Sequence, residues 1–223
     1  MAIEPQTKLR IPLLLLVAAD LALLAMRVRP WGEILSLPDK GSSAIDPAVC
    51  LCGYAGLILW FTSRSGSRLI SAQSEVTFLG LLAGALIGME IWVSGLPSGA
   101  RFDATQMILL CAGGIVWGIA GMRAARAAES VGSSLIPGVW AAMVSTLIAC
   151  GVELGQFYIS GPPPDTPDAY KQFQEIGLGD PATVVLIHAL TAVTGLLLIG
   201  PLIGGTLALI FAFFARKREP QAT

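Results

Sequence analysis

The sequence has few charged residues and a single histidine. Only 13% of its 223 residues are Asp, Glu, Lys or Arg, whereas 54% are hydrophobic and the mean hydropathy is +0.73. Soluble domains carry about 25% charged residues, so the composition excludes an ordinary soluble protein. It predicts one membrane-embedded domain over residues 1–223. The net charge of -1 comes without a basic block, so nucleic acid is not an expected partner.

Motifs for metal binding and nucleophilic catalysis are also missing. One histidine cannot build an H-E-x-x-H zinc site, and neither a G-x-S-x-G elbow nor a phosphate-binding loop occurs. The four cysteines lie in apolar runs, which predicts small buried side chains rather than a disulfide framework or zinc ligands: Cys50, Cys52, Cys111 and Cys150. The sequence therefore predicts no metal and no cofactor, and it leaves open whether a reaction is catalysed.

What the sequence does contain is a series of six apolar runs. They predict an all-α bundle of six transmembrane helices over residues 11–26, 48–62, 76–93, 105–122, 135–159 and 182–215. The first run leads directly into Arg27-Val28-Arg29-Pro30, which favours an uncleaved anchor over a signal peptide. The last run has 34 residues, or about 50 Å of helix against about 30 Å of hydrocarbon. A single tilted helix kinked at Pro201 is the expectation.

The basic residues predict the orientation of this bundle. With six spans, nine of the 14 basic residues share one side with both termini. The positive-inside rule then places both termini in the cytoplasm. The glycines of residues 80–88 and 195–205 are predicted to be close helix contacts, because small residues let backbones approach in lipid.

A few polar residues interrupt the apolar runs. Glu153 and Gln156 lie three residues apart on one helical face, just before prolines 162–164 end the helix. A carboxylate at mid-bilayer is disfavoured by roughly 2.5 to 3.5 kcal/mol, so such groups usually have a partner or line a wet cavity. The predicted topology places several polar residues in the outer half of the membrane or in the loops above it. We therefore expect one polar site that opens away from the cytosol, formed by Asp20, Glu90, Arg101, Asp103, Glu153, Gln156, Asp180 and His188.

A short pattern recurs within the chain. Gly88-Met89-Glu90-Ile91 is followed 63 residues later by Gly151-Val152-Glu153-Leu154, and Ser-Gly and a proline-containing loop follow each copy. The pattern suggests two helical hairpins, residues 76–122 and 135–215, related by an axis along the membrane normal. Chance recurrence in an apolar sequence of low complexity is the alternative.

These residues resemble the motif of the VanZ-like family of small bacterial membrane proteins. The second copy has Glu153, Gln156, Asp180 and Gly195, with His188 where the family usually has an asparagine. The first copy has Glu90, Arg101, Asp103, Gly114 and Gly118, but Val93 replaces the glutamine. The resemblance covers roughly residues 80–201. It implies a location in the bacterial cytoplasmic (inner) membrane and, in some members, a link to resistance against glycopeptides such as teicoplanin at the cell envelope.

Three classes of function follow from these features. The first is a VanZ-type envelope protein that binds or modifies a lipid-linked or glycopeptide-related ligand, with Glu153 as acceptor or proton shuttle, Gln156 orienting a headgroup and Arg101 holding an anion. The second is a small proton-coupled transporter, which would need polar groups at several depths of the membrane. The third is a structural or assembly subunit whose acids only pair between helices. The sequence does not reveal the oligomeric state.

Overall fold

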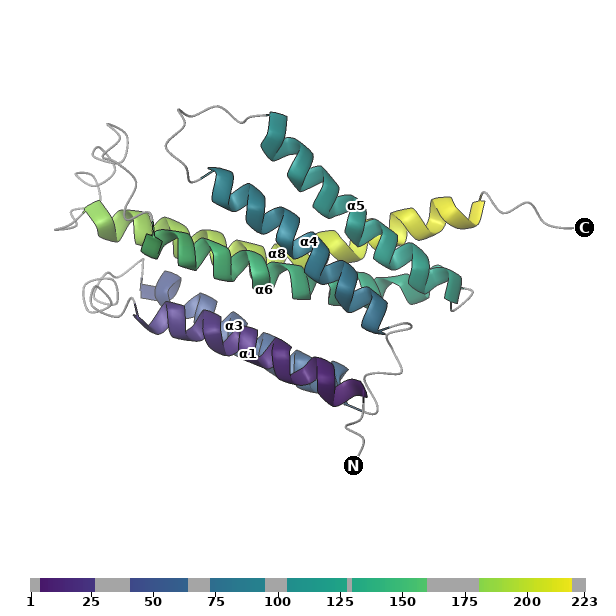
Figure 1. The fold of residues 1–223 in the computed structure, drawn as a ribbon, viewed down its shortest axis with the longest axis horizontal. Helices are drawn as coiled ribbons and strands as arrows, with labels where there is room; N and C mark the ends of the chain where they lie inside the picture. The colour runs from purple at the N-terminus through teal and green to yellow at the C-terminus, as the bar shows by residue number, and fades with distance from the viewer. Residues whose placement is uncertain are drawn as a thin grey trace, which may run out of the picture.

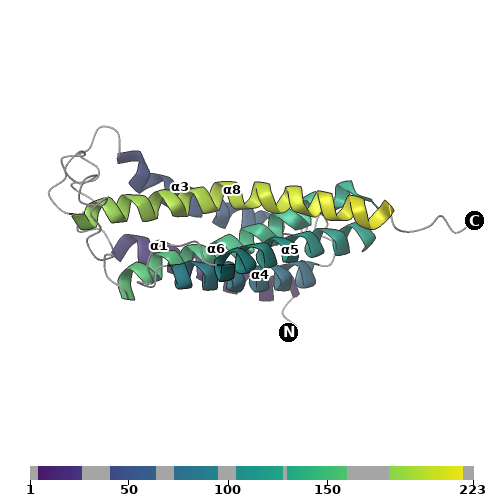
Figure 2. The ribbon, with the colours of Figure 1, turned by 90° about the horizontal axis from the view of Figure 1, so that it is seen from above.

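The helices of the chain form an elongated bundle in a computed structural model (Figures 1 and 2). The structure describes residues 5–26, 41–63, 73–94, 104–127, 130–159 and 181–217. Every long element in these ranges is an α-helix: α1 (Pro5–Met26), α3 (Gly41–Phe61), α4 (Gln73–Ser94), α5 (Ala104–Ala127), α6 (Leu135–Ile159) and α8 (Pro181–Lys217). A short 3-10 turn, η2 (Gly132–Ser134), precedes α6.

Five of the six helices are long and apolar enough to cross a membrane. The apolar part of α3, Ile45–Phe61, is shorter. Large hydrophobic side chains such as Leu15, Phe78, Ile108 and Leu202 are more than 60% exposed on the outside of the bundle. An apolar outer surface on helices that satisfy their own backbone hydrogen bonds suits a lipid environment. The expected helical membrane protein is thus confirmed at this level.

The helix bounds differ from the apolar runs of the sequence. α1 begins at Pro5 and not at residue 11, α3 begins at Gly41 and not at residue 48, and α5 continues to Ala127. The helices extend into polar sequence because helical hydrogen bonding does not require apolar side chains. Hydropathy therefore locates the membrane-embedded part of each helix and underestimates the helix itself.

The centre of the bundle is α6, which packs against α4, α8, α1 and α5. None of residues 140–147 is more than 2% exposed. Trp140 is fully buried, and its indole N–H donates a hydrogen bond of 2.9 Å to Thr77 Oγ1 on α4. The indole of Trp117 on α5 likewise donates to Ser145 Oγ at 2.9 Å. Each buried polar group on this face of α6 thus has a partner on a neighbouring helix, as burial requires.

Glycines bring α4 and α6 into close contact. A Cβ atom added at Gly80 would lie 2.7 Å from the Ala141 carbonyl oxygen, and one at Gly84 would lie 2.9 Å from Ser145 Cα. One turn further on, Gly88 faces Val152. The contacts advance together along both helices, so α4 and α6 run in parallel. The predicted glycine contacts are confirmed for residues 80–88 and, within residues 195–205, for Gly200, Gly204 and Gly205, all of which face α6. Among the glycines of these two ranges, only at Gly195 would a Cβ meet nothing within 4 Å.

The long C-terminal helix α8 continues through Pro201 without interruption. Proline has no backbone N–H, so the carbonyl of Leu197, four residues earlier, lacks its helical donor. The hydroxyl of Tyr54 on α3 donates a hydrogen bond of 2.6 Å to that carbonyl oxygen. The same hydroxyl lies 3.1 Å from Thr146 Oγ1 on α6. One tyrosine thus compensates for the proline and joins three helices.

The helices alternate in direction, which gives the bundle two distinct ends. α1, α4 and α6 finish at one end, which we call the acidic end because it holds Asp20, Glu90 and Glu153. α3, α5 and α8 finish at the other, the arginine end, which holds Arg126 and Arg216. Pro5 and Lys217 both lie at the arginine end (Figure 1). The two hairpins α4–α5 and α6–α8 therefore share one orientation, while an internal repeat stays a prediction.

Candidate functional site

The acidic end contains the most strongly buried carboxyl group of the described residues. Asp20 on α1 is only 1% exposed, and neither of its carboxylate oxygens has a hydrogen-bond partner within the ranges that the structure describes. A Cβ atom added at Gly151 on α6 would lie 2.8 Å from Asp20 Oδ1. Asp20 therefore occupies space that is open only because α6 has a glycine at that point.

Two further carboxyl groups, those of Glu153 on α6 and Glu90 on α4, belong to the same end of the bundle. Both are partly buried and close enough for their charges to interact. The Cys150 thiol is fully buried on α6 and is close enough to Asp20 and Glu153 to interact with the charges of both. Cys150 and Glu153 are three residues apart and share a helical face. Asp20 packs against α6 at Gly151, while Glu153, two residues further along α6, interacts with Glu90 on α4.

Gln156 ties the ends of α4 and α6 together. Its Nε2 donates a hydrogen bond of 3.2 Å to the backbone carbonyl oxygen of Trp92. That carbonyl lies in the last turn of α4, where carbonyl groups have no partner within the helix. The bond follows the Gly88–Val152 contact by one turn, so it extends the packed interface to the helix ends. Gln156 consequently has a structural role in addition to the one predicted from the sequence.

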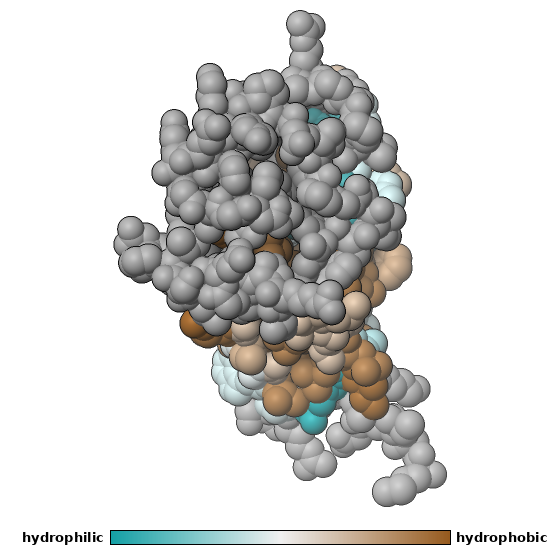
Figure 3. Space-filling view, turned by 90° about the vertical axis from the view of Figure 1, so that its left-hand side faces the viewer, coloured by the Kyte–Doolittle hydropathy of each residue, from teal (hydrophilic) through white to brown (hydrophobic). Residues whose placement is uncertain are grey.

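The structure describes part of the predicted polar site. It brings Asp20, Glu90, Glu153 and Gln156 to one end of the bundle. Arg101, Asp103 and Asp180 lie outside the described residues, as does the side chain of His188, whose backbone belongs to α8. Viewed from the acidic end, the described atoms that are visible are mostly hydrophobic, with a few polar patches (Figure 3). The shared wet pocket itself stays a prediction.

The sequence reasoning missed two residues of this site. Gly151 provides the space for Asp20, and the Cys150 thiol is close enough to the carboxyl groups of Asp20 and Glu153 to interact with their charges. Their position two and three residues before Glu153 is the available indication. For two cysteines the expectation of burial is wrong, because Cys52 and Cys111 are exposed on the outside of the bundle. An apolar helix in lipid has an outer face, so residence in an apolar run does not imply burial.

No group of three or more metal-ligating side chains that could hold an ion occurs among the described residues. Comparisons with protein-family models, with curated proteins and with solved structures find no match to this chain. The functional argument therefore depends on the residues themselves.

Proposed function

We propose that the acidic end binds the headgroup of a lipid-linked or glycopeptide-related ligand at the outer leaflet of a bacterial inner membrane. The observation that carries this proposal is the Asp20 carboxyl, which is buried and has no described partner. A buried acceptor left unpaired costs about 1–3 kcal/mol, and a ligand that donates hydrogen bonds can recover that energy. The hydroxyl, amide and ammonium groups of sugars and peptides are such donors.

Glu153 and Glu90 supply further acceptors in this proposal. Both are partly buried beside the packed interface of α4 and α6, so they are held by rigid helices rather than by loops. Glu153 is the group that would exchange a proton with the ligand, because it interacts with Glu90 and follows Gly151, against which Asp20 packs, by two residues. Arg101, Asp103, Asp180 and His188 would complete the site, with Arg101 holding an anionic group.

The orientation is part of the same proposal. Six spans with both termini in the cytoplasm would place the acidic end at the outer leaflet, as expected for a VanZ-type envelope protein. In support, the described arginines Arg10, Arg123, Arg126 and Arg216 all belong to segments at the arginine end, which is the end that the positive-inside rule assigns to the cytoplasm.

The pair Gly151→Ala and Gly155→Ala tests this site directly. A Cβ at Gly151 would collide with Asp20 Oδ1 and displace the carboxyl, whereas a Cβ at Gly155 meets nothing within 4 Å. The purified protein in nanodiscs would be titrated with a lipid-linked disaccharide-peptide and with teicoplanin. We expect one of these probes to raise the unfolding temperature of the wild type and of Gly155→Ala, but not of Gly151→Ala or Asp20→Asn. An equal response in all four proteins, or none in the wild type, would exclude the proposal.

A proton-coupled transporter is the second candidate, and one observation favours it. Buried hydroxyl groups continue from the acidic end towards the arginine end, with Thr146 and Ser145 on α6 followed by Thr77 on α4. Polar groups therefore occur at several depths, contrary to what the ionisable residues alone suggest. Proton uptake by proteoliposomes under an imposed pH gradient, abolished by Asp20→Asn, would establish this function. Absence of uptake together with absence of ligand binding would leave the structural-subunit interpretation.

A further inference from the structure

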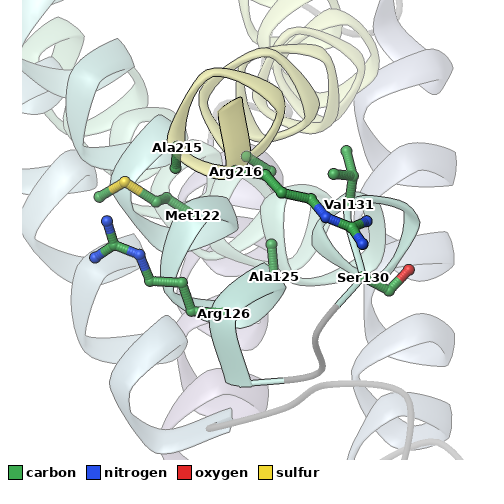
Figure 4. Close-up of a pocket in the computed structure, with 8 residues that line it drawn as sticks. Met122, Ala125, Arg126, Ser130, Val131, Ala215 and Arg216 are labelled. Atoms are coloured by element: carbon green, nitrogen blue, oxygen red, sulfur yellow. The ribbon is translucent and has the colours of Figure 1, made fainter. Parts of the chain in front are cut away.

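A cavity of about 410 Å³ opens at the arginine end of the bundle (Figure 4). It lies between the last turn of α5, the turn that leads into α6, and the last turn of α8. Its lining includes Arg126, Ser130 and Arg216. The guanidinium of Arg216 lies beside Val131 and Ser130, whereas that of Arg126 lies on the other side of Ala125, towards Met122 (Figure 4). Two positive charges thus flank the cavity.

These two arginines differ from the other arginines of the described residues. Arg10 donates to the hydroxyl and carbonyl oxygens of Thr62, and Arg123 forms an ion pair of 3.3 Å with Glu75. Arg126 and Arg216 are exposed, and within the described ranges neither has an acidic partner. The cavity is therefore lined by charge that the described part of the protein does not neutralise.

An apolar groove adjoins the cavity. The groove has a volume of about 370 Å³ and shares Met122, Arg126 and Ala215 with the cavity, to which it adds Phe211 and Phe214. Phe214 is 59% exposed on the outer side of α8. The positively charged cavity thus continues into the apolar groove, which opens towards the outside of the bundle.

Helix electrostatics explains only part of this arrangement. Arginines in the last turns of α5 and α8 interact favourably with the helix dipoles, and basic residues are common at cytoplasmic helix ends. Neither effect requires a cavity or an adjoining phenylalanine groove. The Ser130 N–H donates a hydrogen bond of 3.2 Å to the Ala125 carbonyl oxygen, which satisfies one of the carbonyl groups that would otherwise disfavour an anion here.

We propose that this site binds an anionic phospholipid, with its phosphate-bearing headgroup between Arg126 and Arg216 and an acyl chain along Phe211 and Phe214. Basic pockets between membrane helices on the cytoplasmic side suit such headgroups. The two guanidinium groups flank the cavity rather than converge on one point, which fits an extended headgroup better than a small ion. The site is at the opposite end from the acidic cluster, so this inference does not depend on a ligand bound there and shares with the proposed function only the orientation of the bundle.

Lipid titration of the purified full-length protein tests the site. Native mass spectrometry in a non-ionic detergent would count bound phosphatidylglycerol and, for comparison, phosphatidylcholine. We expect preferential binding of phosphatidylglycerol and a loss of affinity of about fivefold for each of Arg126→Gln and Arg216→Gln. Arg216→Lys keeps the positive charge and is expected to retain most of the affinity. It serves as a control that a change of side chain at position 216 does not by itself unfold the protein.

Two matched controls separate a defined site from general attraction. Arg123→Gln removes a neighbouring charge that is already paired, and Phe78→Ala removes an exposed phenylalanine on α4 that does not line the groove. Both should bind phosphatidylglycerol like the wild type, whereas Phe214→Ala should bind it more weakly. Equal losses in Arg123→Gln and Arg126→Gln, or in Phe78→Ala and Phe214→Ala, would overturn the proposal. Displacement of the lipid by millimolar inorganic phosphate would also overturn it and indicate a small-anion site.

Discussion

The two ends of the bundle each contain unpaired charged groups, but in opposite surroundings. At the acidic end, Asp20 is 1% exposed and packs closely against Gly151. At the arginine end, Arg126 and Arg216 are exposed around an open cavity. An exposed guanidinium keeps its hydration and costs little, whereas a buried carboxyl loses its hydration and gains no described hydrogen bond. Burial, rather than charge, therefore decides which end carries an energetic cost that calls for a functional explanation.

The largest effect is expected where the helices that join the two ends pack most closely. Gly80→Leu would push a side chain into the Ala141 carbonyl and Val144, at 2.7 and 2.9 Å from the new Cβ. Overpacking of this kind costs about 3 kcal/mol or more when backbone must move. Thermal unfolding in nanodiscs should show a large drop for Gly80→Leu and almost none for Gly56→Leu, whose Cβ meets nothing within 4 Å. Similar losses in both variants would refute the packing of α4 against α6.

A smaller loss of stability is expected when the buried hydroxyl of Tyr54 is removed. Unlike the Asp20 carboxyl, this hydroxyl has hydrogen-bond partners. Tyr54→Phe removes the donor to the Leu197 carbonyl oxygen, which Pro201 leaves without a helical N–H. The orphaned carbonyl should cost about 1–2 kcal/mol of unfolding free energy. Pro201→Ala restores the helical donor, so Tyr54→Phe should be less costly in that background. Additive losses in the double mutant would show that the tyrosine and the proline are not coupled.

Substitution of Asp20, in contrast, is expected to increase the free energy of unfolding. Leucine has the same branching as aspartate, so Asp20→Leu replaces an unpaired buried carboxyl by an apolar side chain of similar shape. We expect a gain of about 1 kcal/mol in the free energy of unfolding, because the desolvation cost disappears. A loss of stability measured in nanodiscs would mean that Asp20 has a structural partner, and would favour the assembly-subunit interpretation over a ligand site.

Sequence reasoning succeeded where a property is local to one helix. Hydropathy located the helices, and the cost of a carboxylate in lipid singled out Asp20, Glu90 and Glu153, which the fold brings to one end. Sequence reasoning failed to predict which side chains of a helix are buried, because burial depends on which face of the helix points towards the bundle. Cys52 and Cys150 belong to equally apolar helices, yet one is exposed and the other buried. An apolar surface in lipid carries little amphipathic pattern, so the sequence does not show which face of a helix points inward.

The arginines illustrate the same limit. Arg126 and Arg216 contributed to the predicted orientation only as positive charges, and they are 90 residues apart in the sequence. Their common cavity arises because α5 and α8 finish at the same end and pack against each other. A pairing between distant helices of this kind has no local sequence pattern.

The smallest effect is expected for the paired arginine. Arg123 and Glu75 form an ion pair of 3.3 Å, but their side chains are 55% and 59% exposed. Exposed pairs of this type contribute at most about 0.5 kcal/mol and weaken with salt. Arg123→Gln should therefore leave the unfolding temperature in nanodiscs almost unchanged at 0.15 M salt. A loss of stability as large as that of Tyr54→Phe would mean that solvation cannot replace the ion pair of Arg123. The arginine end would then, like the acidic end, contain a charged group on which the stability of the fold depends, and the contrast between the two ends would no longer hold.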